Sequence, residues 1–197
     1  MNAQHAEQNL AVIRTLMERS ALYRRALGPI FLVTGGIGVL AALAGVILPM
    51  ESRAGFLGLW IAAAVVAIVV AVLMTRRQAL RDREPLWSAP ARRVAHAMLP
   101  PLLVGAALTA VVGEIFVVMP VWMILYGCAL HATGFVTPRA VRWLGAAFMA
   151  AGVISLAIFG IWYSARAAAG LMGATFGGLH LLCGLYLTTT QKGSNGQ

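Results

Sequence analysis

Acidic residues and cysteines are scarce in this chain of 197 residues, which contains 6 Asp and Glu residues and 2 Cys residues. No stretch gathers carboxylates into a cluster, which argues against a carboxylate-based catalytic or metal site, and two cysteines do not make the disulfide framework of a small secreted domain. The chain also lacks a phosphate-binding P-loop, a Gly-x-Ser-x-Gly nucleophile motif and an HExxH zinc motif. The sequence therefore predicts a protein that is not an enzyme.

Hydrophobic residues fill 60% of the chain and charged residues 11%, and the mean hydropathy is +0.84. This composition excludes an ordinary soluble domain. A helix needs ~20 apolar residues to cross the hydrocarbon core of a bilayer, and six apolar runs approach or exceed that length. The runs cover residues 28–49, 54–75, 98–118, 120–136, 143–163 and 167–187. We expect an all-α fold, a polytopic membrane protein with six transmembrane helices.

The apolar runs divide the chain into three expected parts. Residues 1–26 are predicted to form a cytoplasmic amphipathic helix on the membrane interface, because apolar and charged side chains recur on opposite faces over 6–26. Residues 27–188 are predicted to form the six-helix transmembrane bundle. The polar residues 189–197 are predicted to form a flexible cytoplasmic tail.

Two connections between the runs carry prolines. We expect a long inner loop over residues 76–97, in which Pro85 and Pro90 prevent one continuous helix. Met119 and Pro120 separate the third run from the fourth, so a tight turn between two antiparallel helices is expected there.

The basic residues are distributed asymmetrically, because all but two of the 15, Arg53 and Arg166, fall on one side of the six runs. Short loops rich in Lys and Arg stay in the cytoplasm, so we expect a location in the bacterial inner membrane with both termini cytoplasmic. The net charge of +9 then points to anionic lipid headgroups rather than nucleic acid. A membrane protein partner and a homo-oligomer stay open as alternatives.

Glu114 is the one acidic residue inside a predicted span. An ionisable side chain within a membrane is costly, so by default it suggests a functional site such as a transport path or a proton relay. Glu114 lies near the outer end of its run, where it would also reach headgroups or pair with Arg53 or Arg166. The position favours a structural or interfacial role and leaves transport as the alternative.

Two short patterns combine cysteine and histidine, with Cys128 and His131 in the fourth run and His180 and Cys183 in the sixth. Three-residue spacing places each pair on one helix face. At matched depth the four side chains could bind zinc, and His131 and His180 could be the axial ligands of a haem. Glycines on the same faces favour close helix packing instead, with histidines that hydrogen-bond across the helix interface. We therefore expect no cofactor, with zinc and haem as alternatives.

Three segments of the chain carry a resemblance to a known family. They are IRTLMERSALYRR at 13–25, WMILYGCALHATGFVTPRAVRWLG at 122–145 and FGGLHLLCGLYL at 176–187. Together they resemble a family of small, uncharacterised, multi-pass bacterial membrane proteins with an N-terminal IRxLMERS helix. The resemblance implies no catalytic residue. It directs attention to Glu18-Arg19-Ser20, Tyr126-Gly127, Pro138-Arg139 and His180.

The basic cytoplasmic face carries the main functional hypothesis, an integral inner-membrane protein that engages a partner or anionic lipid. Its candidate interaction residues are Glu18, Arg19, Arg139 and Arg142, and we predict an ion pair between Glu18 and one of the last two arginines. One alternative is a small transporter or channel with Glu114 on the path. The other is a haem- or metal-binding membrane subunit.

Overall fold

A computed structural model of the protein describes residues 26–48, 52–83, 85–158 and 164–194. All regular structure in this part of the chain is helical. The helices are Ala26–Ile47, α2 (Arg53–Arg81), α3 (Ala89–Val111), α4 (Ile115–Thr133), α5 (Arg139–Ala157) and one continuous rod of α6 (Ala165–Met172), the π-helical segment η2 (Gly173–Leu179) and α7 (His180–Ser194). The amphipathic helix predicted over 6–26 falls almost entirely outside the described residues.

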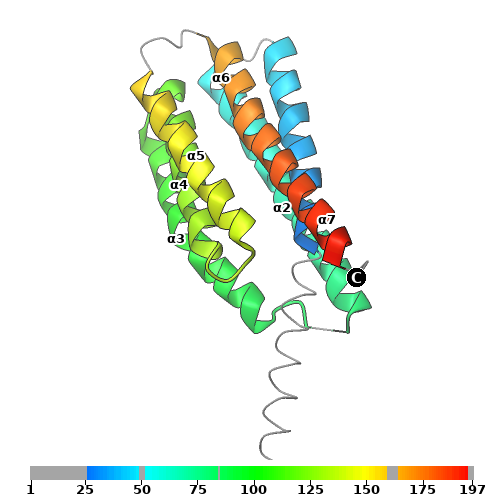
Figure 1. The fold of residues 1–197 in the computed structure, drawn as a ribbon. Helices are drawn as coiled ribbons and strands as arrows, with labels where there is room; N and C mark the ends of the chain where they lie inside the picture. The colour runs from blue at the N-terminus through cyan, green and yellow to red at the C-terminus, as the bar shows by residue number, and fades with distance from the viewer. Residues whose placement is uncertain (1–25, 49–51, 84, 159–163, 195–197) are drawn as a thin grey trace, which may run out of the picture.

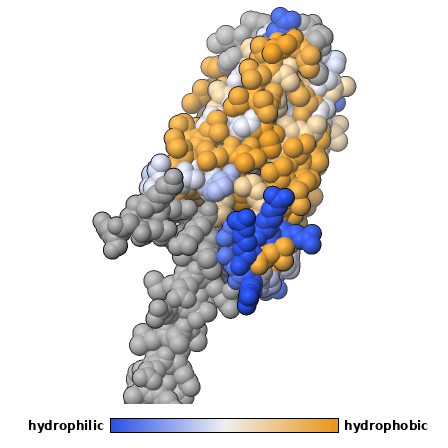
Figure 2. Space-filling view, turned by 90° about the vertical axis from the view of Figure 1, so that its right-hand side faces the viewer, coloured by the Kyte–Doolittle hydropathy of each residue, from blue (hydrophilic) through white to orange (hydrophobic). Residues whose placement is uncertain are grey.

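Five of these helices are long and apolar enough to cross a membrane, and α4 contributes a shorter apolar stretch, Val117–Thr133. Large apolar side chains cover the outside of the bundle, and α3 buries Gly105 alone. Figure 2 shows this apolar surface as a broad orange zone above a blue hydrophilic patch. An apolar surface of this extent is stable against lipid tails but unfavourable in water. The protein is therefore a multi-pass membrane protein.

The helices form two lobes that lie side by side in Figure 1. Lobe 1 contains the helix Ala26–Ile47, α2 and the α6–η2–α7 rod. Lobe 2 contains α3, α4 and α5, in which α4 packs against both of its neighbours. The two lobes meet where α4 and α5 contact the rod.

The connection between α2 and α3 is much shorter than the predicted loop over 76–97, because α2 continues to Arg81 and α3 begins at Ala89. The arginines of this segment are good helix formers and extend both helices. Pro90 is accommodated in the first turn of α3, where a missing N–H costs nothing. The predicted break in the helix is confirmed, but Pro90 lies inside α3 and the predicted extent of the loop was wrong.

Arg83 ends α2 in a left-handed conformation, with φ of 53°. A side chain in this conformation is strained by about 1 kcal/mol, and glycine is the usual residue there. We expect Arg83→Gly to raise the free energy of unfolding by about that amount, measured by thermal unfolding in a zwitterionic detergent. Arg81→Gly removes the same charge inside the helix and should be destabilising by a similar amount. Equal effects of the two variants would contradict this account of the helix end.

The turn between α3 and α4 lies at residues 112–114 rather than at Met119-Pro120, so the predicted position was wrong. Val112 and Glu114 take extended conformations on either side of Gly113, with ψ of 117° and 123°. Pro120 instead lies inside α4 and is buried. Neighbouring helices make such a proline tolerable within a membrane bundle.

The last helix extends to Ser194, so residues 189–194 of the predicted tail are helical. Hydroxyl groups support this end, because Thr188, Thr189 and Thr190 donate to carbonyls one turn earlier at 2.7–3.0 Å. These bonds give the polar side chains partners that a hydropathy pattern does not reveal.

Candidate functional site

The most deeply buried polar side chain of the described residues is His180, the first residue of α7, which has 0% of its surface exposed. Its Nδ1 lies 2.6 Å from the carbonyl oxygen of Phe176, one turn earlier on the same rod. Its Nε2 lies 2.8 Å from the hydroxyl of Tyr126 on α4. The ring therefore bridges the two lobes, with both nitrogens satisfied.

The two contacts fix which atoms donate. A carbonyl oxygen only accepts, so Nδ1 carries the hydrogen that points to Phe176. In a neutral imidazole the other nitrogen is then an acceptor, and the Tyr126 hydroxyl donates to Nε2. Tyr126 and His180 thus form one directed hydrogen bond between lobe 2 and lobe 1.

Aromatic rings enclose this pair. Phe176 and His180 have ring centroids 4.7 Å apart, and Phe148 packs edge-on against Tyr126 at 5.1 Å and against His180 at 5.4 Å. Phe31 completes the enclosure at 5.6 Å from the histidine ring. Such edge-to-face contacts favour defined ring orientations and keep water from the hydrogen bond.

The π-helical segment η2 directly precedes His180 and is rich in glycine. Gly177 packs against the first helix, because a Cβ built there would lie 2.9 Å from the backbone N of Val39. The wider backbone spiral of a π segment rotates the residues that follow it, and such segments are frequent at functional sites. We attribute the inward position of His180, toward α4, to this segment.

The four residues predicted as metal ligands do not converge. Cys128 contacts the Met149 sulfur at 3.5 Å, and His131 Nδ1 lies 3.3 Å from the backbone carbonyl of Arg142, so both face α5. Cys183 is buried in the apolar core. In the residues that the structure describes, no three His, Cys, Asp or Glu side chains are grouped to hold a metal ion.

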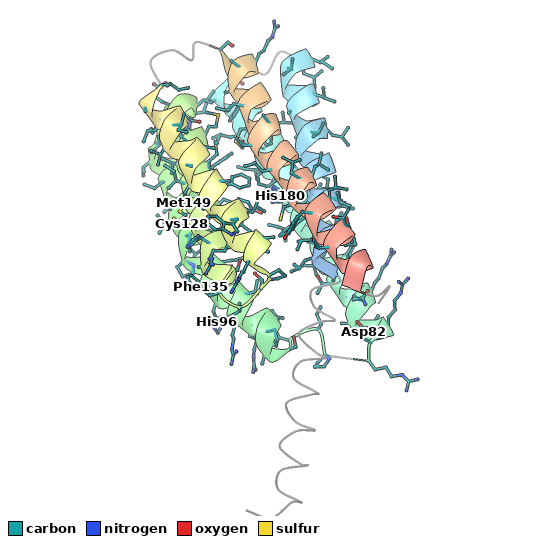
Figure 3. The ribbon with its side chains drawn as sticks, viewed as in Figure 1. Asp82, His96, Cys128, Phe135, Met149 and His180 are labelled. Atoms are coloured by element: carbon teal, nitrogen blue, oxygen red, sulfur yellow. The ribbon has the colours of Figure 1, made fainter. Side chains whose placement is uncertain are left out.

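A four-ligand zinc site is therefore not formed, because α4 and the rod turn these residues toward different neighbours. Figure 3 shows Cys128 beside Met149 in lobe 2 and His180 on the rod. A haem held between His131 and His180 does not fit either, since His180 already uses both ring nitrogens within the protein. The expectation of hydrogen bonds across helix interfaces is confirmed for both histidines.

Close packing through glycine, the interpretation that the spacing favoured, is confirmed. A Cβ at Gly127 of α4 would lie 2.7 Å from the carbonyl of Gly145 on α5. A Cβ at Gly35 of the first helix would lie 2.9 Å from the carbonyl of Gly177 on the rod. Each lobe is thus built around a helix pair whose backbones touch.

Glu114 does not lie inside a helix as predicted, but is the exposed residue that precedes α4 in the turn between α3 and α4. The guanidinium of Arg53, one of its predicted partners, donates instead to the carbonyls of Thr109 at 2.6 Å and Val112 at 2.9 Å. These carbonyls end α3, where a cation is favourable. The extended backbone around Gly113 places the carboxylate outside either helix.

Arg139 and Arg142 begin α5 at the same end of the bundle as the α2–α3 connection. The Arg142 guanidinium lies 5.6 Å from the centroid of the exposed Phe135 ring, a cation–π contact. Their predicted partner Glu18, together with Arg19, lies outside the described residues. An ion pair between Glu18 and these arginines stays a prediction.

The sequence pattern drew attention to His180 and Tyr126 but did not join them, and it gave no role to Phe31, Phe148 or Phe176. The signal that could have found these rings is their position, since all three lie within predicted spans. The enclosed pair offers a neutral donor and acceptor that join α4 to the rod. Comparisons with protein-family models, curated proteins and solved structures found no match for this chain.

Proposed function

We propose that this protein is a non-enzymatic integral protein of the bacterial inner membrane that binds anionic lipid headgroups through its basic end. The proposal includes six spans, with α4 as the short fourth span, and both termini in the cytoplasm. The residues that carry it are the described arginines where α2 ends and α3 and α5 begin: Arg76, Arg77, Arg81, Arg83, Arg92, Arg93, Arg139 and Arg142.

Exposed apolar side chains accompany these arginines. Leu80 is 70% exposed, Trp87 62% and Trp143 69%. Tryptophan is favoured at the interface between hydrocarbon and headgroups, and arginine pairs with phosphate through planar, two-pronged hydrogen bonds. The combination of arginines with exposed tryptophans and leucine supports a lipid partner over a purely polar protein surface. Each arginine near the headgroups contributes ~1 kcal/mol to the free energy of membrane binding.

The alternative of a transport path through Glu114 has little support, because that side chain lies in an exposed turn rather than among the helices. A haem-binding role has little support either, since the His180 nitrogens have partners within the protein. The resemblance to small multi-pass bacterial membrane proteins agrees with the proposed location. It implies no catalytic residue.

Lipid retention tests the proposal. We expect the purified protein to retain phosphatidylglycerol over phosphatidylcholine in native mass spectrometry, and the variant Arg76→Gln/Arg77→Gln/Arg81→Gln to retain roughly 10-fold less phosphatidylglycerol, given ~1 kcal/mol per arginine before screening. Arg166→Gln, which removes a charge at the opposite end, is the matched control and should retain the lipid. Equal retention of the two lipids by the unmodified protein would rule the proposal out.

A further inference from the structure

Two polar links join the lobes in the part of the chain that the structure describes. At one end, Arg53 of α2 donates to the last carbonyls of α3, Thr109 O and Val112 O. Midway along the bundle, Tyr126 donates to His180. The hydrogen bonds of the described residues include no further link between the lobes toward the basic end.

The contacts within each lobe differ in kind from those between the lobes. The close approaches of the described glycines all lie within a lobe, as for Gly127 with Gly145 and Gly35 with Gly177. The seam between the lobes is formed instead by large rings, with Tyr126 5.2 Å from Phe176. Backbone contact through glycine joins the first helix to the rod and α4 to α5, whereas rings can slide or part without straining a backbone.

Charge at the basic end acts against closure of the seam. Lobe 1 carries Arg76, Arg77 and Arg81 there, on the last turns of α2. Lobe 2 carries arginines of the same sign, at the starts of α3 and α5: Arg92, Arg93, Arg139 and Arg142. Like charges on facing bodies repel, and the repulsion depends on salt and on bound anions.

We infer that the seam between the rod and α4–α5 is a hinge, which Arg53 holds at one end and whose closed state the Tyr126–His180 hydrogen bond stabilises. The seam opens at the basic end, where the short α2–α3 connection still joins the two lobes. The pair is the only described polar contact between the lobes beyond the Arg53 hydrogen bonds. A ligand that binds the open or the closed state of such a hinge more tightly shifts the equilibrium toward that state. This inference does not depend on the identity of the lipid proposed above.

Spin-label distances in the full chain test the hinge. On a background with Cys128→Ala and Cys183→Ala, the pair Leu80→Cys/Trp143→Cys reports the basic end. The pair Ile47→Cys/Val111→Cys reports the opposite end. All four labelled positions are exposed, at 69–78%.

We expect Tyr126→Phe to add a longer distance at the basic end and to leave the opposite end unchanged. Loss of one buried hydrogen bond should raise the ratio of open to closed molecules roughly 10-fold. The matched control is Tyr186→Phe, which removes a hydroxyl from an exposed tyrosine of the rod and should change neither end. An unchanged basic end, or equal broadening at both ends, would overturn the inference.

Arg53→Ala provides a second test should Tyr126→Phe fail to fold, because the Arg53 side chain is exposed. Loss of the Arg53 hydrogen bonds should add longer spin-label distances at the opposite end. The Tyr126–His180 hydrogen bond should keep the basic end closed. If Arg53→Ala leaves the opposite end unchanged, Arg53 does not pin the lobes and the hinge is wrong.

Discussion

Replacing Gly145 by alanine is expected to lower the free energy of unfolding by about 1–3 kcal/mol, the usual range for overpacking a filled interface. A Cβ at this position would meet the backbone N of His131 and would lie 2.6 Å from the carbonyl of Gly127. Backbone atoms cannot turn aside as the end of a flexible side chain can. The α4–α5 pair must therefore separate, which loosens the centre of lobe 2.

The control for this substitution is Gly36→Ala, because a Cβ at Gly36 meets nothing within 4 Å. Alanine has the higher helix propensity, so this variant should be equally stable or more stable by about 0.5–1 kcal/mol. Gly35→Ala tests the other lobe one residue away, since its Cβ would lie 2.9 Å from the Gly177 carbonyl. Thermal unfolding in detergent, followed by circular dichroism, measures all three. The interpretation of glycine packing fails if Gly145→Ala and Gly36→Ala unfold alike.

The second large effect is expected at the enclosed hydrogen bond. Tyr126→Phe leaves His180 Nε2 buried without a donor, which should reduce stability by about 1–3 kcal/mol. His180→Leu leaves the Tyr126 hydroxyl without its acceptor and should be destabilising to a similar degree. The double variant removes both polar atoms, so it should lose less stability than the sum of the single variants.

Denaturant unfolding of the four proteins gives the coupling energy between the two side chains. A coupling near zero would show that the hydroxyl and the imidazole do not stabilise one another, despite their 2.8 Å separation. A second cycle with Tyr186→Phe and His180→Leu should give no coupling, because Tyr186 is 58% exposed and is not one of the described partners of His180.

The sequence could indicate the sites at which residues of one kind recur at a regular spacing along a single helix. Small residues at helical spacing predicted close packing, and the structure pairs Gly127 with Gly145 and Gly35 with Gly177. The pattern could not say which faces pair, because each helix shows several small residues and its rotation about its axis depends on all its neighbours. The zinc alternative rested on such a choice of faces, and in the structure His131 faces α5 whereas His180 faces α4.

The placement of Glu114 illustrates a second limit. The run 98–118 has no other charged residue and is mostly apolar on either side of Glu114, so hydropathy included it in a span. The structure breaks the helix at residues 112–114 and places the carboxylate in an exposed turn. A single glycine gives little local warning of a break, whereas Pro120, the stronger signal, lies inside α4.

By itself the amino-acid sequence determined that the chain is an all-α, multi-pass membrane protein, and that its arginines gather on one side. Both properties follow from composition along the chain, because burial in lipid and attraction to headgroups act on each segment separately. Only the tertiary structure decided that Tyr126 meets His180 across 54 residues of sequence. That contact depends on helix register, on the π segment before His180 and on the pairing of helices into two lobes, and these arise only when the segments pack together.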